Sequence, residues 1–216
     1  MNFSILVGSC DSYSHLWPKF SYLFNKYWDK KIDVKKYIIT ETLDANINGF
    51  ETIKIQNNKN ENYTVGLKIA LNKIQTDNVL WLQDDYFFRK TIEYSEFVNY
   101  YNFFIHHGIW RFGIHDNSDL YDTTEINKNL YLYNQFSHYT ISMQASLWNL
   151  KFFKSCIDRK ESIWDFEVEG SKRLNTSTIH RMCFAAQEKP WYLEACKKGK
   201  LTQDYFTICK EEGLDS

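Results

Sequence analysis

The chain reads Val79-Leu80-Trp81-Leu82-Gln83-Asp84-Asp85-Tyr86-Phe87-Phe88 where two adjacent carboxylates follow its most apolar short run. Residues 78–82 have the length and composition of a strand buried on both faces. Open α/β sheets bind their ligands at the carboxyl ends of such strands. Because neighbouring acids repel each other and lose hydration there, they need a counter-charge or hydrogen-bond donors. The stretch therefore predicts a ligand site at Asp84 and Asp85.

A divalent cation is one such counter-charge. Mg²⁺ and Mn²⁺ prefer carboxylate oxygens and bridge them to the phosphates of a substrate. We predict Mn²⁺ or Mg²⁺ bound by Asp85 and Asp84. The spacing leaves a second interpretation open, in which the pair forms a turn with one acid as a cap and the other in solvent.

The elements before this stretch alternate between strands and helices. Residues 3–8 read as a strand that ends at Gly8, and the polar run 9–12 follows it. Apolar residues recur every three to four positions over 14–28 and 64–73, which predicts helices. Two further short runs, 36–40 and 51–56, read as strands. This order predicts an α/β fold with a mixed, mostly parallel sheet flanked by helices.

The pattern is less regular after residue 90. It predicts helices over 95–106, 148–156 and 168–174, a strand over 109–114 and a strand pair over 131–142. No repeat and no linker interrupts the chain. We therefore expect a single domain over residues 1–216.

Composition excludes several classes of protein. The 26 Lys and Arg against 27 Asp and Glu leave a net charge of −1, which argues against a nucleic-acid partner. No apolar run approaches the roughly 20 residues of a membrane span, and the first residues lack the pattern of a signal peptide. The five cysteines are scattered and odd in number, which predicts reduced thiols. We expect a cytoplasmic protein, with peripheral association at the inner face of the membrane left open.

Aromatic residues make up 18% of the chain. Their faces suit stacking on nucleobases and on sugar rings, but they fill hydrophobic cores equally well. The aromatic content by itself therefore names no function.

A set of short motifs carries a resemblance to a known family. In chain order they are Gly8-Ser9-Cys10-Asp11-Ser12-Tyr13 with Leu16-Trp17 and Tyr27-Trp28, then Leu82-Gln83-Asp84-Asp85-Tyr86-Phe87, then Ser142-Met143-Gln144-Ala145-Ser146-Leu147-Trp148, and then Trp164-Asp165-Phe166-Glu167-Val168-Glu169-Gly170-Ser171. Together they resemble the landmarks of bacterial GT-A-type nucleotide-sugar glycosyltransferases of capsule and lipopolysaccharide assembly. The match to the family's Asp-x-Asp motif is incomplete, because Gln83 stands in place of the first acid.

The resemblance implies a GT-A (Rossmann-like) domain with a nucleotide-binding half over 1–90 and an acceptor-side half over 91–216. It also implies metal-assisted transfer of a sugar from a nucleotide sugar, with a UDP-sugar as the expected donor. The implied acceptor is a glycan or a lipid-linked glycan of the cell surface. In this scheme Asp85 holds the metal between the two phosphates, and Asp84 contacts the ribose or the sugar.

The resemblance assigns further residues to the donor. Ser9, Asp11 and Tyr13 would meet the base and ribose, with Asp11 accepting a hydrogen bond and Tyr13 stacking. Gln144 would contact sugar hydroxyls, and Lys172 would neutralise the diphosphate. Simpler interpretations stay open for Asp11 as the cap of a turn or helix and for Lys172 as part of a solvated helix face.

The acids of Trp164-Asp165-Phe166-Glu167-Val168-Glu169 are candidates for the general base. An extended segment places all three acids on one side, whereas a helix from Asp165 places Asp165 and Glu169 on one face without Glu167. We predict Glu167 as the base and Asp165 as the second candidate, since the flanking apolar residues would raise the pKa of Glu167. The alternative is that Asp165 caps a helix and the acids are solvated.

Two other functions remain in competition. A nucleotidyltransferase-like or hydrolytic enzyme would use the same metal–diphosphate chemistry, although the chain has no glycine-rich phosphate loop. A non-catalytic module that binds a nucleotide or a carbohydrate would also account for the aromatic content. Turnover separates the module from either enzyme.

Overall fold

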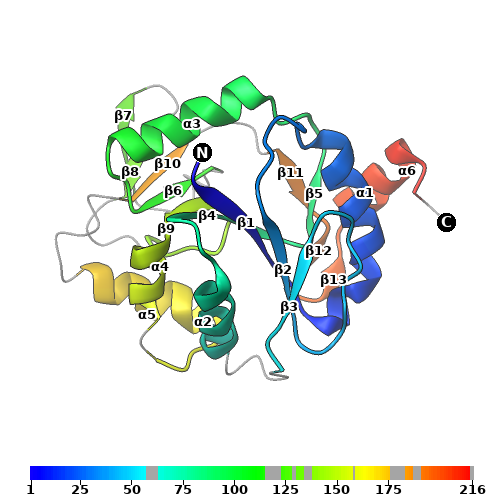
Figure 1. The fold of residues 1–216 in the computed structure, drawn as a ribbon, viewed down its shortest axis with the longest axis horizontal. Helices are drawn as coiled ribbons and strands as arrows, with labels where there is room; N and C mark the ends of the chain where they lie inside the picture. Colours follow the sequence, from blue (N-terminus) through cyan, green and yellow to red (C-terminus); the bar gives the residue numbers. More distant parts are fainter. Residues whose placement is uncertain are drawn as a thin grey trace.

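The strand that precedes the two carboxylates lies inside a nine-stranded sheet with the order β3-β2-β1-β4-β9-β6-β10-β8-β7 (Figure 1). The structure is a computed structural model, and it describes residues 1–56, 63–114, 123–127, 130–133, 138–157, 159–175, 183–186 and 191–214. The strands of this sheet are β1 (Phe3–Gly8), β2 (Lys36–Thr40), β3 (Glu51–Lys54), β4 (Asn78–Gln83), β6 (Arg111–Gly113), β7 (Thr123–Asn127), β8 (Leu130–Tyr133), β9 (Ser146–Asn149) and β10 (Cys183–Ala186).

Four parallel strands form the first part of the sheet. β1 pairs in parallel with both β2 and β4, and β3 adds to the far side of β2. The register sets Gly8 of β1 opposite Gln83 of β4. The two strands therefore end together, and the polar residues that follow each of them meet at one edge of the sheet.

The second part of the sheet is mixed. β9 runs antiparallel between β4 and β6, so it joins strands from the two halves of the chain. β10 pairs in parallel with β6, and β8 and β7 follow as antiparallel strands. This confirms the prediction of a mixed, mostly parallel sheet.

Helices cover both faces of the sheet (Figure 1). They are α1 (Trp17–Tyr27), which follows a short 3-10 turn at Asp11–Leu16, α2 (Tyr63–Lys73), α3 (Tyr94–His106), α4 (Leu150–Cys156), α5 (Ile163–Asn175) and α6 (Gln203–Glu212). None of the helices in the described part of the chain is long and apolar enough to cross a membrane.

The alternation of β4 explains the two layers of core. Leu80 and Leu82 point to one face, where they pack with α1 and α3 in one buried cluster. Val79 and Trp81 point to the other face, where they pack with α2, α4 and α5 in a second cluster. A strand buried on both faces has to be apolar at every position, which is the pattern that predicted it.

Four short strands form two small sheets apart from the main sheet. β5 (Tyr86–Phe88) pairs with β11 (Tyr192–Glu194) in a separate two-stranded sheet, and β12 (Cys196–Lys197) pairs with β13 (Lys200–Leu201). The sequence patterns did not predict these elements. β5 and β11 bring residues more than 100 positions apart into contact, so no local pattern reveals their pairing.

Three predicted elements differ from the structure. The helix expected over 168–174 begins five residues earlier, as α5 at Ile163, and ends at Asn175. The helix expected over 148–156 begins only at Leu150, because Trp148 belongs to β9, and Asn149 accepts the N–H of Phe152 as a helix cap at 3.0 Å. The strand pair expected over 131–142 is realised only at its start, as the end of β8. Residues 134–137 lie outside the described residues, and a turn occupies 138–140.

Candidate active site

The two predicted acids stand at the carboxyl edge of β1 and β4. The backbone N–H of Asp84 donates to the carbonyl of Gly8 at 3.1 Å, which extends the pairing of the two strands by one residue. Gly8 approaches the buried ring of Trp81 so closely that a Cβ at position 8 would overlap it. The absence of a side chain at Gly8 therefore lets the two strand ends come together.

Asp84 is turned into the protein and is 4% exposed. Its Oδ2 accepts hydrogen bonds from the hydroxyl of Ser9 and, at 3.1 Å, from the indole N–H of Trp17, which also donates to Ser9 at 2.8 Å. Burial raises the pKa of Asp84 to about 8, and the charge of Asp85 adds to the increase. Asp84 thus ties β4 to β1 and α1.

Asp85 presents an oxygen that nothing in the described part of the chain satisfies. Its Oδ1 is buried and has no hydrogen-bond partner among the described residues. Burial, and then the charge of Glu194, raises the pKa of Asp85 to about 7. Its backbone carbonyl accepts from Ala195 at 2.7 Å, which fixes β11 beside it. An orphaned carboxylate oxygen beside a second carboxylate is suited to a cation or a hydrogen-bond donor from a ligand.

A polar cluster joins Asp85 to the loop before β9. The rings of Tyr86 and Tyr192 stack with centroids 4.0 Å apart, and both hydroxyls donate to Oε1 of Gln144 at 3.1 Å. The amide of Gln144 reaches Oε1 of Glu194 at 3.4 Å. The structure therefore links the predicted Gln144 to Glu194, whose charge in turn acts on Asp85. The sequence resemblance pointed to Gln144 and Asp85 but not to Glu194.

Hydrogen bonds with β4, α5 and Arg111 hold the loop that carries Gln144 in place. The carbonyl of Met143 accepts from Trp81 and Gln83 at 2.9 Å each, and its N–H donates to Oε1 of Glu167 at 2.6 Å. Arg111, which is 1% exposed, donates to the carbonyls of Thr140 and Ser142 and to the hydroxyl of Ser146.

Glu167 lies on the inward side of α5. Burial raises the pKa of its carboxyl, whereas the bond from Met143 and the nearby charge of Arg111 oppose the increase. Burial is the main cause of the raised pKa of Tyr86, and the charges of Asp85, Glu194 and Glu167 add to the increase. Glu167 is connected to the loop that carries Gln144 through the N–H of Met143.

Asp165 has a different position. The segment is helical, and Asp165 lies exposed in the first turn of α5, where it bonds with Ser162: the hydroxyl donates to the carboxylate at 2.7 Å and accepts the N–H of Asp165 at 3.2 Å. This is a capping arrangement in which Ser162 is the cap and Asp165 bonds back to it from the first turn. It resembles the alternative interpretation for Asp165, but Glu167 is partly buried and not solvated as that interpretation held. On the same exposed side Lys172 pairs with Glu169 at 2.6 Å.

Asp11 closes the loop that follows β1. Its carboxylate accepts from the backbone N–H groups of Glu41, Thr42 and Leu43, and its own N–H donates to Glu41 at 2.8 Å. Partial burial opposes ionisation, but the bonds from Thr42 and Leu43 lower the pKa of Asp11. The hydroxyl of Tyr13 accepts from the thiol of Cys196 at 3.3 Å. Asp11 therefore shapes the rim of the site through β2, and Tyr13 contacts the segment after β11.

Sequence reasoning missed Glu194, Tyr192 and Arg111. Glu194 and Tyr192 follow a tryptophan in a short run without a recognisable motif, and Arg111 sits in a three-residue strand. The charge of Arg111 among apolar neighbours was the only local signal, since a buried arginine requires several acceptors.

The carboxylates around Asp85 could supply part of the ligand set of a hard cation such as Mg²⁺ or Mn²⁺. The described residues contain no group of three or more His, Cys, Asp or Glu placed to bind a metal ion. The buried, unpartnered Oδ1 of Asp85 lies within the field of the Glu194 carboxylate, and carboxylate oxygens are ligands of the type that Mg²⁺ and Mn²⁺ prefer. These cations complete their coordination with water and substrate phosphates, so a small protein donor set is sufficient.

Comparison with known proteins bears on the fold. Neither the protein-family models nor the curated proteins contain a match to this chain. Among solved structures, S. aureus TarS 1-349 matches 89% of this chain at a TM-score of 0.55 and 12% identity. The complex of TarS 1-349 with UDP matches the same 89% of this chain, with a TM-score of 0.58 and 11% sequence identity. The complex with UDP-GlcNAc matches 99% of this chain, with a TM-score of 0.51 and 12% sequence identity.

The fold is the GT-A glycosyltransferase fold. At such low identity the similarity establishes the architecture and no residue role. The chain spans 60% of the length of the TarS structures with and without UDP, and 66% of the one with UDP-GlcNAc. Open α/β sheets bind their ligands at the carboxyl ends of their parallel strands, and the two carboxylates lie at the carboxyl ends of β1 and β4.

Proposed function

We propose that this chain is a glycosyltransferase that moves a sugar from a UDP-sugar to a glycan or lipid-linked glycan acceptor with the assistance of Mn²⁺ or Mg²⁺. The observation that carries the proposal is the unsatisfied, buried Oδ1 of Asp85 at the carboxyl edge of β4 in a GT-A fold, where the charge of Glu194 acts on it and Glu194 accepts the amide of Gln144. The TarS structures add support, because their complexes contain UDP and UDP-GlcNAc.

The donor side of the site is assigned to the strand ends. Asp85, supported by Glu194, would hold the cation, which when bound neutralises the diphosphate of the donor. Asp84 and Ser9 hold the two strand ends in place, and the hydroxyl of Ser9 faces the same edge. Gln144 would orient the sugar with the amide hydrogen that remains after its bonds to Tyr86, Tyr192 and Glu194.

The remaining donor residues have more limited roles. Asp11 keeps the 41–43 segment against the loop after β1, so its effect on the donor is indirect. Tyr13 remains the candidate ring for the nucleobase, because it lies half-buried on that same loop. Lys172 is paired with Glu169 on the exposed side of α5, which favours a role at the surface over one at the diphosphate.

Glu167 is the proposed general base. Its burial disfavours the charged form and its Oε1 is oriented by the N–H of Met143, as a base positioned for proton transfer requires. The acceptor oxygen forms a bond to the anomeric carbon, the bond from that carbon to the diphosphate breaks, and the acceptor proton passes to Glu167. The nucleoside diphosphate leaves from the face opposite to the attack, which inverts the anomeric centre.

Two measurements test this proposal together. Calorimetry with UDP and Mn²⁺ follows binding, and release of UDP from a panel of UDP-sugars follows turnover. We expect Asp85→Asn to lose Mn²⁺-dependent binding. Glu167→Gln is expected to bind UDP normally but to release it about 10²- to 10⁴-fold more slowly in the presence of acceptor.

The matched control is Asp165→Asn, which changes an exposed acid two residues away and should leave both measurements near those of the unaltered protein. Binding of UDP with no turnover for any donor would favour the non-catalytic module. Normal turnover by Glu167→Gln would mean that Glu167 is not the general base, which would then have to be sought at Asp165 or elsewhere.

A further inference from the structure

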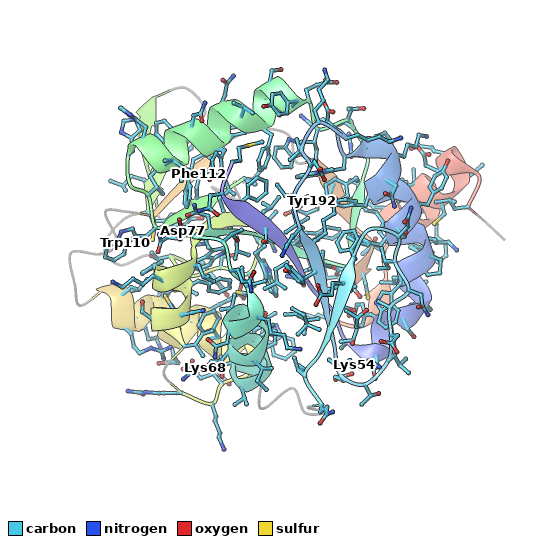
Figure 2. All side chains as sticks on the ribbon, in the orientation of Figure 1. Lys54, Lys68, Asp77, Trp110, Phe112 and Tyr192 are labelled. Carbon is cyan, nitrogen blue, oxygen red and sulfur yellow. The ribbon has the colours of Figure 1, made fainter. Side chains whose placement is uncertain are left out.

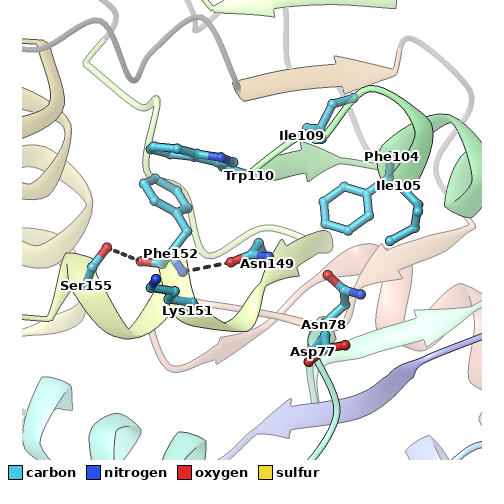
Figure 3. Close-up of a pocket in the computed structure, with 11 residues that line it drawn as sticks. Asp77, Asn78, Phe104, Ile105, Ile109, Trp110, Asn149, Lys151, Phe152 and Ser155 are labelled. Carbon is cyan, nitrogen blue, oxygen red and sulfur yellow. Dashed lines mark hydrogen bonds between the residues drawn. The ribbon is translucent and has the colours of Figure 1, made fainter.

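A second concavity lies at the opposite edge of the sheet from the carboxylates. It has a volume of about 760 Å³ and lies between the end of α3, the residues just before β6, the start of β4 and the first turns of α4 (Figure 3). β4 runs from this cavity to the candidate active site. Its six residues separate the two by about 17 Å at ~3.3 Å per residue. Figure 2 likewise shows Tyr192 well apart from Asp77 and Trp110.

Aromatic rings form one wall of the cavity. Trp110 and Phe152 lie with ring centroids 4.8 Å apart at an angle of 42°, and Figure 3 shows Phe104 and Ile105 across from them. Trp110 is half-buried, so part of its ring is accessible from the cavity side of the molecule. The negative face of an aromatic ring attracts C–H groups, and a pyranose offers a flat face of such groups.

Polar side chains lie around the rings. Asp77 accepts the amide N–H of Asn2 at 2.6 Å, and Asn149 is held at the start of α4 by its bond to Phe152 at 3.0 Å. Lys151 is exposed at the same rim. Groups that are already anchored lose little conformational freedom when a ligand binds, which favours recognition of hydroxyls around a ring.

The charges of the lining select against an anion. Among the described residues that line the cavity, Asp77 and Lys151 are the ionisable ones, and their opposite charges cancel. The backbone N–H of Phe152 in the first turn of α4 is already taken by Asn149, so it does not attract a phosphate. A neutral ligand with one apolar face and many hydroxyls matches this lining better than a phosphate or a nucleotide.

We propose that this cavity is a saccharide-binding site separate from the candidate active site, and that it accepts a neutral sugar unit of an oligosaccharide on the rings of Trp110 and Phe152. Asp77, Asn149 and Lys151 contact the hydroxyl groups of the sugar. The site requires neither a nucleotide sugar nor a cation, and so it stands independently of the proposed transfer activity.

Binding of uncharged tetrasaccharides tests the site without any donor. Saturation-transfer NMR and calorimetry would be run with the tetramers of N-acetylglucosamine and of glucose, and with uridine as a non-saccharide probe. We expect at least one tetrasaccharide to bind with a Kd on the order of 1 mM. Trp110→Ala should weaken it about tenfold.

Four further variants keep the test independent of folding and of the other site. Lys151→Ala and Asp77→Ala alter exposed polar groups of the cavity and should each weaken binding. Trp164→Ala, which removes a tryptophan that is 62% exposed elsewhere, should leave it unchanged. Asp85→Ala should also leave it unchanged, whatever that variant does to UDP.

Several results would overturn the proposal: no tetrasaccharide binds at about 10 mM, binding is equal in Trp110→Ala, uridine binds in the cavity in preference to the sugars, or Asp85→Ala abolishes the binding. The last result would place the saccharide in the candidate active site. Loss of transfer activity in any variant bears only on the proposed function, because no step of this experiment uses a donor.

Discussion

At the scale of single residues, Asp84 and Asp85 are adjacent in the sequence but have different surroundings in the structure. Asp84 is bonded to Ser9 and Trp17 inside the protein, whereas Asp85 keeps an unsatisfied oxygen toward Glu194. Burial is the larger cause of the raised pKa in both cases. A cost of this kind is tolerated where a ligand relieves it, which is why such groups concentrate at functional sites.

The raised pKa of Asp84 predicts a loss of stability at high pH. A carboxyl whose folded pKa is about 8 and whose unfolded pKa is near 4 favours the folded state below pH 4, and this contribution disappears as the pH rises through 8. The contribution of Asp85 to the stability of the folded state is likewise lost as the pH rises through about 7. In EDTA, we expect the free energy of unfolding to fall by about 2 kcal/mol between pH 6 and pH 8.

Urea unfolding at a series of pH values measures this fall. Asp84→Asn cannot ionise and should show a clearly smaller decrease, and Asp165→Asn should show the full decrease. Equal slopes for Asp84→Asn and the unaltered protein would mean that the decrease comes from other groups.

Gly8 is a second residue where small changes should have large effects. A methyl group at position 8 would meet the six-membered ring of Trp81, whose N–H is fixed by Met143. Gly8→Ala should therefore destabilise the protein by about 1–3 kcal/mol in urea unfolding. The double variant with Trp81→Phe should lose less than the sum of the two single variants, since the smaller ring leaves room; strict additivity would argue against the clash.

At the scale of elements, the loop between residues 140 and 146 is the part of the site that most needs support. Residues 140–145 belong to no helix or strand among the described residues. Hydrogen bonds with β4, with α5 and with Arg111 hold the loop so that Gln144 reaches Glu194. Arg111 suits this role because its planar fork donates in several fixed directions at once.

Arg111→Lys should show what the fork contributes. Lysine keeps the charge but cannot reach Thr140, Ser142 and Ser146 together, so we expect a loss of about 1–3 kcal/mol. Hydrogen exchange at residues 140–146 should accelerate more than exchange in β1. Uniform acceleration across the sheet would indicate a general loss of stability and no special role for the loop.

At the scale of the whole molecule, the sheet separates two places where ligands are expected. Its carboxyl edge carries the carboxylates and the proposed sugar transfer, and its amino edge carries the cavity between α3 and α4. The two core layers on either side of β4 keep these edges apart, because β4 is buried on both faces along its whole length.

The five cysteines are spread over this molecule without forming a disulfide. All five are free, and Cys156, Cys183, Cys196 and Cys209 are buried. We expect thiol titration of the unfolded, unreduced protein to find five thiols, and titration of the folded protein to find chiefly Cys10. A count well below five after unfolding would contradict this expectation.

The sequence alone determined the central strands, most helices and the edge at which the acids stand. β1, β2 and β4 coincide with the predicted runs to within a residue, because burial on two faces imposes an apolar pattern that is visible locally. The GT-A fold was implied separately, by the resemblance of the short motifs to GT-A-type glycosyltransferases.

Only the tertiary structure decided which acid is engaged and which is open. Trp17 reaches Asp84 across 67 positions of the chain, and Glu194 reaches the site through the pairing of β11 with β5. Such contacts depend on how distant elements pack, and local hydrophobic patterns carry no information about them. The sequence therefore locates the site, and the packing of distant segments selects the atoms that a ligand meets.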